Sequence, residues 1–542
     1  MASRRGVPRR SVFVLLALVA VCHSACSQPT ASPSLADPDD RAAEHIEEFA
    51  AAKELFDGPG SEGEVRAMQY AQQYFDEIGL DTVVQSVPLV RMIQTSTDVY
   101  VRVPQPDGAP NTWALDGANF VVWAGQQQEQ VALSAAPVVF AGYGIVSPEY
   151  TRDDFKGVDV DGKIVLVLQG SPHTADRDDL GALGEAYYGR PFYKFEEASR
   201  QGAAGVIIIH DELEPWDDIR AEFADEVITI EDADAMLAQA TVEGWLSRPA
   251  ARSLLEQASL DLDHLSLKAR QLAFQPTELD GVRVDIAISS TIERATTQNV
   301  IALQRGELPE WVMLGARWNG LPTEAISAVT DAAMSPGESN TFGDGSAAAA
   351  VMEIARRLVA RFPPGQDPRR GIVYTISTAL APGMVGLRYF SDHPSIPAPG
   401  PGDDLEELPL DKTRGHIFLD HAAPGHASHA IGKIGTGSGR VLSHMIRSVA
   451  IQQRRLVVLD QSVERRFYYS YSQSAFARHG VPTLYLTTPP DHEHLTPVQA
   501  DAQTEGAAAA ESFNLDASLL VELLTMMANT THFPRESPPL RP

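Results

Sequence analysis

The sequence predicts an α/β protein with a mostly parallel, twisted sheet that carries helices on both faces. From residue 284 onward, short apolar runs alternate with segments whose apolar residues recur at helical spacing. The short runs contain few charges, which is typical of strands buried on both faces of a parallel sheet. The alternation of strands and helices implies that helices cover this sheet on both sides.

The N-terminal part of the body is expected to be helical and then extended. Residues 41–79 hold two stretches with apolar residues at helical spacing, and the second ends at Gly79, a residue that commonly stops a helix. A strand is expected at 82–90. Residues 97–130 alternate in the manner of antiparallel strands joined by turns.

The middle of the chain contains strongly apolar strands. Two runs at 138–146 and 163–170 suit interior strands, and a helix at 193–201 leads into a third apolar run at 202–211. Residues 215–270 give a mixed, loop-rich pattern. The polar stretch 270–283 resembles a junction between two parts of the protein.

The C-terminal half carries the alternating pattern that predicts the fold class. Helices are expected at 345–361 and 507–528. A proline- and glycine-containing stretch with four acids, residues 396–409, is expected to be a surface loop. The expected strands are residues 299–304, 311–316, 372–377, 415–420, 455–459 and 482–487.

The first 26 residues have the composition of an export signal. Four arginines precede an apolar run at 12–21 that is too short to span a bilayer. Small residues then lead to Cys26, which resembles the lipidated cysteine of a bacterial lipoprotein; simple cleavage nearby is the alternative. Residues 27–40 have the composition of a linker. We therefore expect an exported protein of the periplasm or cell envelope, anchored by lipid at Cys26.

Charge and cysteine content exclude several classes of site. The net charge of −29 argues against binding nucleic acid through its phosphates, which needs a basic surface. Both cysteines, Cys22 and Cys26, lie in the signal region. The body therefore has no disulfide, thiolate metal site or cysteine nucleophile. No GxSxG nucleophile motif occurs.

The carboxyl ends of the predicted strands are where a ligand should bind in an open parallel sheet. These ends carry Arg317, Leu380 with Ala381, and Asp420, and His494 lies just past the last strand. The strand at 372–377 leads into the turn that contains Leu380 and Ala381. An enzyme would need carboxylates at this turn, and the chain has two apolar side chains there.

Motifs along most of the body resemble the M28 zinc aminopeptidases, in particular the subgroup with an inserted protease-associated (PA) domain. The segments that carry the resemblance are VVFAGYGIVSPEYTRDDFKGVDVDGKIVLVLQGSP and KFEEASRQGAAGVIIIHD for the inserted domain, then TTQNVIALQRGELPEWVMLGARWNGL, GDGSAAAAVMEIAR, KTRGHIFLDH, FARHGVPTLYLTT and HEHLTP for the peptidase. The resemblance implies a zinc-exopeptidase-like domain formed by residues 41–125 and 284–532. Residues 126–283 would form the β-rich PA domain and its junction.

The activity implied by this resemblance requires two zinc ions that share a carboxylate and activate a water, with a separate glutamate as general base. In the segment GARWNG, Arg317 takes the place of the first zinc-binding histidine and Asn319 that of a supporting aspartate. The bridging aspartate falls on Gly343. The adjacent Asp344 would become a ligand only with a shift of one residue.

The remaining family positions are partly retained. The paired glutamates, base and ligand, fall on Leu380 and Ala381, whose side chains neither accept a proton nor bind zinc. Asp420 matches an aspartate ligand and His494 the last histidine, with His492 as a close competitor. Two retained ligands would serve one zinc, whereas catalytic zinc normally takes three protein ligands and a water.

We therefore expect a non-catalytic family member without a cofactor, which binds a peptide or protein at the cell envelope. An active metallo-aminopeptidase with a remodelled zinc site is the alternative. Without a metal, Asp420 would be a carboxylate that lacks its cation, and such a charge is costly to bury. Since Arg317 supplies a fixed positive charge at the neighbouring strand end, we predict an ion pair between the two, directly or through Asn319.

A cluster of histidines beside Asp420 offers a second place for a metal. A rebuilt site at these residues is one interpretation, and a histidine-rich loop of small residues in contact with solvent is the favoured one. The histidines concerned are His416, His421, His426 and His429.

Overall fold

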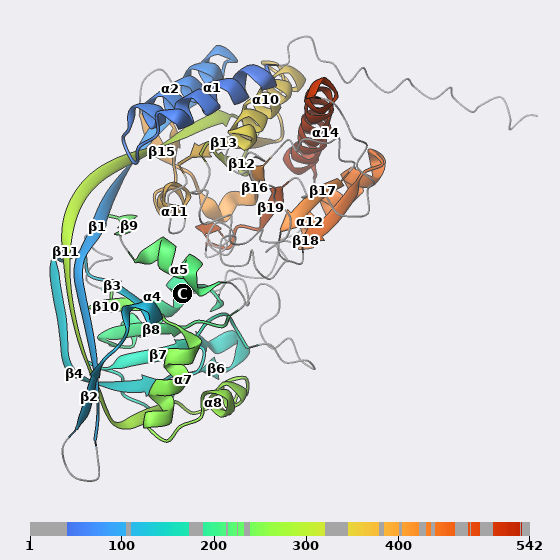
Figure 1. The fold of residues 1–542 in the computed structure, drawn as a ribbon. Helices are drawn as coiled ribbons and strands as arrows, with labels where there is room; N and C mark the ends of the chain where they lie inside the picture. Colours follow the sequence, from blue (N-terminus) through green and yellow to red (C-terminus); the bar gives the residue numbers. More distant parts are fainter. Residues whose placement is uncertain are drawn as a thin grey trace, which may run out of the picture. The chain divides into compact units, whose positions relative to one another are not determined.

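Two long strands run through both halves of the central sheet (Figure 1). β1 (Asp81–Val103) and β11 (Thr277–Gln304) pair antiparallel, from Asp81 opposite Leu303 to Arg102 opposite Arg283. The structure is a computed structural model, and the residues described all belong to one unit, Arg41–Pro542. The described residues are 41–104, 110–172, 188–212, 215–224, 226–231, 239–319, 345–378, 384–399, 404–421, 430–434, 440–460, 475–476, 479–487, 502–531 and 533.

One half of the sheet begins where the end of β11 pairs antiparallel with β13. β13, β12, β16 and β19 then follow in parallel pairs, and β19 pairs antiparallel with β17, which is parallel to β18. The centre of this half is therefore parallel, with an antiparallel strand on each side. The bounds of these strands are β12 (Leu308–Arg317), β13 (Arg370–Ser377), β16 (Thr413–His421), β17 (Ala430–Ile434), β18 (Leu456–Asp460) and β19 (Thr483–Thr487).

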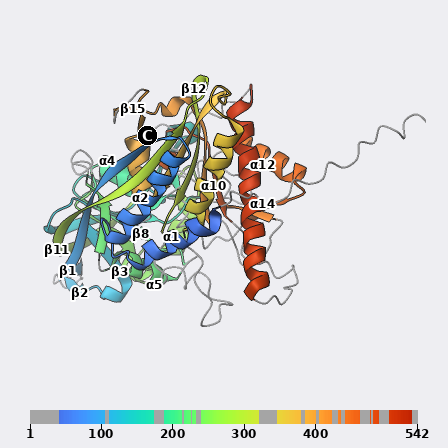
Figure 2. The same ribbon diagram turned by 90° about the horizontal axis from the view of Figure 1, so that it is seen from above.

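Alternating side chains of these strands enter two cores on opposite faces of the sheet. On β13, Ile372 and Tyr374 join the core under five helices, whereas Val373 joins the core under α11 (Val385–Asp392) and Phe476. Figure 2 shows α10 beside α14, and the two helices are in contact. The five helices are α1 (Ala42–Glu54), α2 (Glu62–Glu77), α10 (Ser346–Arg361), α12 (Arg440–Gln452) and α14 (Ala502–Asn529).

The other half of the sheet begins where the first part of β11 pairs antiparallel with β4. β4, β7, β8 and β10 follow in parallel pairs, and β3 closes this side antiparallel to β10. A separate hydrophobic core fills this half. Its elements are β3 (Phe120–Ala124), β4 (Gln130–Phe140), β7 (Ile164–Leu168), β8 (Gly205–Ile209), β10 (Val242–Leu246), α4 (Pro191–Arg200), α5 (Trp216–Phe223), α7 (Arg248–Gln257) and α8 (Leu262–Ala269).

Shorter elements complete the fold. β2 and β9 pair with β1, β5 pairs with β6, and β14 pairs with β15. Within the described residues, no helix is long and apolar enough to cross a membrane. The bounds are β2 (Asn111–Ala114), β5 (Val146–Ser147), β6 (Arg152–Asp153), β9 (Glu226–Ile230), β14 (Ser395–Pro397) and β15 (Leu405–Glu407), with 3-10 turns η1 (Gly117–Asn119), η2 (Pro148–Tyr150) and η3 (Leu410–Lys412).

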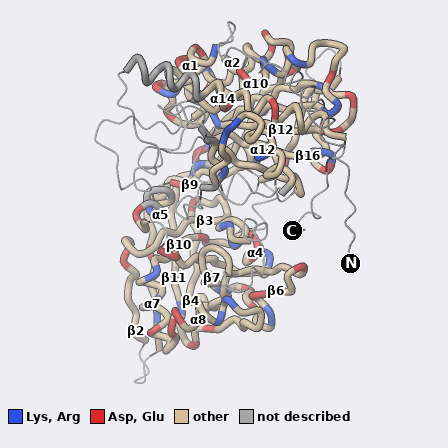
Figure 3. Tube along the Cα trace, turned by 90° about the vertical axis from the view of Figure 1, so that its right-hand side faces the viewer, with Lys and Arg blue, Asp and Glu red and all other residues tan. Residues whose placement is uncertain are grey.

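The predicted fold class is confirmed, since a large sheet with a parallel centre carries helices on both faces of its C-terminal half. Three expectations differ from the structure. Residues 396–409, expected to be a surface loop, include β15 and part of β14. Residues 215–270, expected to be loop-rich, contain α5, β9, β10, α7 and α8. The last part of the expected junction at 270–283 belongs to the beginning of β11. It forms a strand because its residues pair with β4. Acidic and basic residues are interspersed along the trace in both halves (Figure 3).

Candidate functional site

The carboxyl ends of β12, β13 and β16 meet at one edge of the sheet, which we call the strand-end site. β12 ends at Arg317, which stands opposite Ser377 of the parallel strand β13. On the other side of β12, Ala316 stands opposite Leu419 of β16, so that Arg317 and Asp420 come next on two neighbouring strands. Arg317 is only 5% exposed. A buried positive charge therefore occupies this edge.

Most of the other predicted zinc positions lie outside the described residues. Of Asp420 only the backbone is described, as part of β16. The expectations about these side chains, including an ion pair between Arg317 and Asp420, stay predictions. The positions outside the described residues are Gly343, Asp344, Leu380, Ala381, His492 and His494.

A buried hydrogen-bond network, the Glu64 network, fixes the described part of the strand-end site. It consists of Glu64, Thr297, Trp318 and Thr378. The Thr378 hydroxyl donates to Glu64 Oε1 at 2.5 Å and accepts a hydrogen bond from the indole N–H of Trp318 at 3.1 Å. The Thr297 hydroxyl also donates to Glu64 Oε1. The network thus connects α2 with the ends of β12 and β13.

Glu64 is the centre of this network because its carboxylate is fully buried, at 0% exposure. Backbone N–H groups of Gly60 and Gln298 donate to it at 2.5 Å and 3.2 Å. A buried charge without a counter-ion is tolerated when several donors satisfy its oxygens. Trp318 is held from its other side by an edge-on contact with Phe56, with ring centroids 5.4 Å apart.

The start of α11 is anchored by buried contacts as well. Met384 adopts a left-handed conformation (φ 57°) and caps α11. The side-chain amide of Asn299 donates to the carbonyl oxygen of Gly386 at 2.8 Å. A Cβ atom at Gly386 would come within 2.4 Å of Asn299 Oδ1, so the close approach requires glycine. Buried contacts therefore hold Thr378 and Gly386, the described residues on either side of positions 379–383.

The described residues of the strand-end site do not fit the two-zinc centre that the resemblance implies. Zinc takes lone pairs from imidazole nitrogens, thiolates or carboxylate oxygens. The guanidinium of Arg317 is permanently protonated and has no lone pair to give. Asn319 is buried two residues further on, at a place where the resemblance implies a carboxylate. Among the described residues, no three His, Cys, Asp or Glu side chains are grouped to hold a metal ion.

His416 is a core residue. It lies within β16 and is fully buried against Phe476, with ring centroids 4.5 Å apart. Burial lowers the pKa of His416 to about 3, so its imidazole is neutral at physiological pH. His426 and His429 lie outside the described residues, and of His421 only the backbone is described. A metal site built from this cluster therefore stays untested.

Sequence reasoning did not find Glu64, Thr378 or Asn299. Asn299 lies in a segment expected as a strand and Glu64 in a region expected to be helical, whereas Thr378 directly follows the expected strand 372–377. The polar role of each depends on partners far away in the chain. The only local signal was a carboxylate, Glu64, at a helix position whose neighbours Val65 and Met68 are apolar.

Two family models match the halves of this fold. Residues 133–235 match the PA domain, and residues 299–509 match peptidase family M28. Residues 299–509 form an M28 peptidase domain. The match at 299–509 contains β12, β13, β16 and β19, and the match at 133–235 contains β7 and β8. This M28 protein therefore carries its PA domain as an insertion connected through β1 and β11.

Several solved structures resemble this M28 protein. An aminopeptidase from Aneurinibacillus sp. strain AM-1 has 14% identity and a TM-score of 0.48, over 92% of this chain and 97% of that chain. A zinc aminopeptidase from Bacillus subtilis has 14% identity and a TM-score of 0.40, over 90% and 95%. A peptidase M28 precursor from Shewanella amazonensis SB2B has 16% identity and a TM-score of 0.39, over 93% and 96%. No curated protein sequence matches the chain.

Proposed function

We propose that this M28 protein is a catalytically inactive peptidase homologue that binds a peptide or protein ligand at the cell envelope, to which a lipid at Cys26 anchors it. The observation that carries the proposal is Arg317. This buried arginine ends β12 at the place where the family resemblance implies a zinc-binding histidine. A guanidinium repels a divalent cation at this place and cannot bind one.

The magnitude of the catalytic loss supports the proposal. Leu380 occupies the place of the general base, and loss of a general base alone costs roughly 10²–10⁴ in rate. Loss of a metal ligand also removes the means of activating a water at neutral pH. The two losses act on the same chemical step, so family-type hydrolysis through this site would be negligible.

The Glu64 network supports a retained binding role. It holds the ends of β12 and β13 with a buried charge and four donors, and Asn299 holds the start of α11. Such polar networks fix a single arrangement of the elements that they join. A rigid edge lowers the conformational cost of binding a ligand whether or not the ligand reacts.

Metal content and activity test the proposal on the exported chain from Cys26 onward. We expect far less than one tightly held zinc per chain by elemental mass spectrometry, and no aminopeptidase activity on aminoacyl-p-nitroanilide substrates. Calorimetric zinc titration should give no tight binding. Arg317→His with Ala381→Glu, which restores two ligands, should bind zinc more tightly than the natural chain, whereas Arg317→Gln should not.

The rival proposal is an active metallo-aminopeptidase with a remodelled site. About one or more tightly held zinc per chain, together with activity that a chelator removes and zinc restores, would overturn the inactive assignment. Asp420→Ala is the control in that case, because it should abolish both the bound zinc and the activity if this retained aspartate is a ligand.

A further inference from the structure

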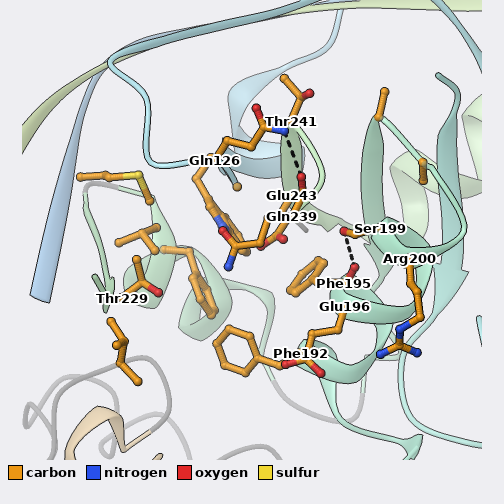
Figure 4. A pocket seen from close by; sticks show the side chains of 18 of the residues that line it. Gln126, Phe192, Phe195, Glu196, Ser199, Arg200, Thr229, Gln239, Thr241 and Glu243 are labelled. Atoms are coloured by element: carbon orange, nitrogen blue, oxygen red, sulfur yellow. Dashed lines mark hydrogen bonds between the residues drawn. The ribbon is translucent and has the colours of Figure 1, made fainter. Parts of the chain in front are cut away.

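A cavity of about 700 Å³ lies against the PA domain, and Arg317, Asn319 and Thr378 of the strand-end site are not among the residues that line it. Elements of the PA half supply most of its lining, and residues of α11 complete it. Figure 4 shows Phe192, Phe195 and Glu196 of α4 on one side and Gln126, Gln239 and Glu243 on another. The cavity therefore combines aromatic faces with a small number of polar groups, as ligand sites do.

Glu243 is the polar group that distinguishes this cavity. It lies on β10, an otherwise apolar strand, and is only 6% exposed. The side chain of Trp123 forms a hydrogen bond with its carboxyl group. A Cβ atom at Gly125 would come within 3.1 Å of the carboxyl carbon of Glu243, so the glycine provides the space in which the acid lies. A carboxyl group buried this deeply on a cavity wall is costly and calls for a function.

Aromatic rings form the wall beside Glu243. Trp123 stacks on Phe223 with ring centroids 4.8 Å apart and meets Phe195 edge-on at 5.6 Å. The guanidinium of Arg388, from α11, lies over the ring of Phe192 at 4.5 Å from its centroid. Aromatic faces attract cations, and the position of Arg388 demonstrates that this wall accepts one.

The charged groups around the cavity are mainly acidic. Burial is the main cause that raises the pKa of Glu243 to about 8; the charge of Glu196 raises it further, and that of Arg388 opposes the rise. In addition to Glu243, the titratable and charged residues that line the cavity are Asp161, Glu196, Arg200, Arg388, Tyr389, Asp392 and His393. With Glu243 ionised, the acids outnumber the two arginines, which favours a cationic ligand.

We propose that this cavity binds the primary ammonium group of a peptide, with Glu243 as the ionic partner and Phe192, Phe195 and Trp123 as the surrounding aromatic wall. The ammonium can come from a lysine side chain or from a peptide N-terminus. The site is separate from the strand-end site, so this inference holds whether or not zinc binds there. Since α11 also receives the Asn299 hydrogen bond at Gly386, a ligand in the cavity contacts the helix that follows the turn.

The ionic partner gives the binding a particular pH dependence. An ammonium group binds the ionised form of Glu243, so binding displaces the proton that the free acid carries below pH 8. For a lysine side chain, whose own pKa lies near ~10.4, affinity should rise on the order of 50-fold between pH 6 and pH 8. An α-amino group titrates near ~8, so its affinity should rise and then fall above that pH.

Calorimetry with short peptides on the full exported chain tests the inference and distinguishes the two sources. The probes are acetyl-Gly-Lys-Gly-amide, which has only a side-chain ammonium, and Gly-Gly-Gly-amide, which has only an α-ammonium. Acetyl-Gly-norleucine-Gly-amide is the neutral control. We expect at least one ammonium peptide to bind at least tenfold more tightly than the control at pH 8, with release of protons to the buffer.

Two matched variants complete the test. Glu243→Gln should weaken ammonium binding at least tenfold at pH 8 and abolish its pH dependence. Glu196→Gln, at an exposed acid on the rim, should change affinity less than threefold and keep the pH dependence. Equal binding of the neutral peptide, unchanged binding by Glu243→Gln, or no ammonium binding at millimolar concentration at pH 8 would each overturn the inference. Circular dichroism of both variants verifies that they are folded.

Discussion

Replacing Thr378 by valine tests whether the Glu64 network holds the strand-end site. Valine keeps the shape of threonine but removes the hydroxyl that donates to Glu64 at 2.5 Å and accepts from Trp318 at 3.1 Å. A hydrogen bond to a charged group contributes about 1.5–3 kcal/mol, and an unpaired buried N–H costs about 1–3 kcal/mol. Glu64 keeps its other three donors, so we expect the free energy of unfolding to fall by about 3 kcal/mol.

Thr375 provides the matched control on β13, three residues before Thr378. It is 2% exposed, and its hydroxyl has no hydrogen-bond partner among the described residues. Thr375→Val should therefore leave stability unchanged or raise it, because it removes a polar group that is already unsatisfied. Both variants change the same atoms at buried positions, one on β13 and one directly after its end. They differ only in whether a network is broken.

Urea unfolding, followed by far-ultraviolet circular dichroism and tryptophan fluorescence, gives the change in the free energy of unfolding for both variants. Amide hydrogen exchange of the β13 segment reports local opening of the strand end. Compared with the natural chain, we expect faster amide exchange at residues 376–378 in Thr378→Val and an unchanged exchange rate in Thr375→Val. Equal stability of the two variants would refute the assignment of Glu64 and Thr378 as the anchor of this turn.

The remaining predictions concern two buried titratable groups that respond to pH in opposite directions. Burial raises the pKa of Glu243 from 4.5 to about 8. Between these two pH values Glu243 is protonated in the folded chain and ionised in the unfolded chain. Between pH 6 and pH 9 the free energy of unfolding of the natural chain should fall by about 3 kcal/mol, and that of Glu243→Gln should not show this fall. Melting temperatures that change with pH in parallel in the two proteins would contradict this. Burial lowers the pKa of His416 from 6.5 to about 3. Below pH 6.5 this histidine therefore takes up a proton in the unfolded chain but stays neutral in the folded chain. From pH 7 to pH 5 the free energy of unfolding of the natural chain should therefore fall by about 2 kcal/mol, and that of His416→Leu should not show this fall. Equal acid sensitivity of the two proteins would argue for a charged or metal-bound His416.

The strands and helices of the C-terminal half could be predicted because the local pattern of apolar residues in the sequence indicates which residues are buried. On β12, Val312, Leu314 and Ala316 enter one core and Met313 enters the other, so the strand is apolar throughout. The expected helix at 345–361 is α10, whose alanines and Met352 are buried. Such patterns depend on neighbours within a few residues and need no knowledge of distant contacts.

Elements with a weaker local pattern were missed. β17 is a short strand that contains a glycine and a lysine, and its place between β18 and β19 makes it a strand. α12 was also missed, although its buried residues Leu442, Ile446 and Val449 lie at helical spacing. α11 follows directly on the turn after β13 and is only eight residues long, which is too short for periodicity to decide.

The candidate sites divide in the same way. That the resemblance puts Arg317 and Leu380 at the places of a zinc ligand and a base is a prediction from the sequence alone. The strongly acidic composition and the absence of cysteine from the body also follow from the sequence alone. Which groups surround these residues was decided only by the tertiary structure, because Thr378 is 314 positions from its hydrogen-bond partner Glu64. The cavity around Glu243 likewise required the folded chain, since the cost of burying a carboxyl group depends on packing that brings β3, α4, β10 and α11 together.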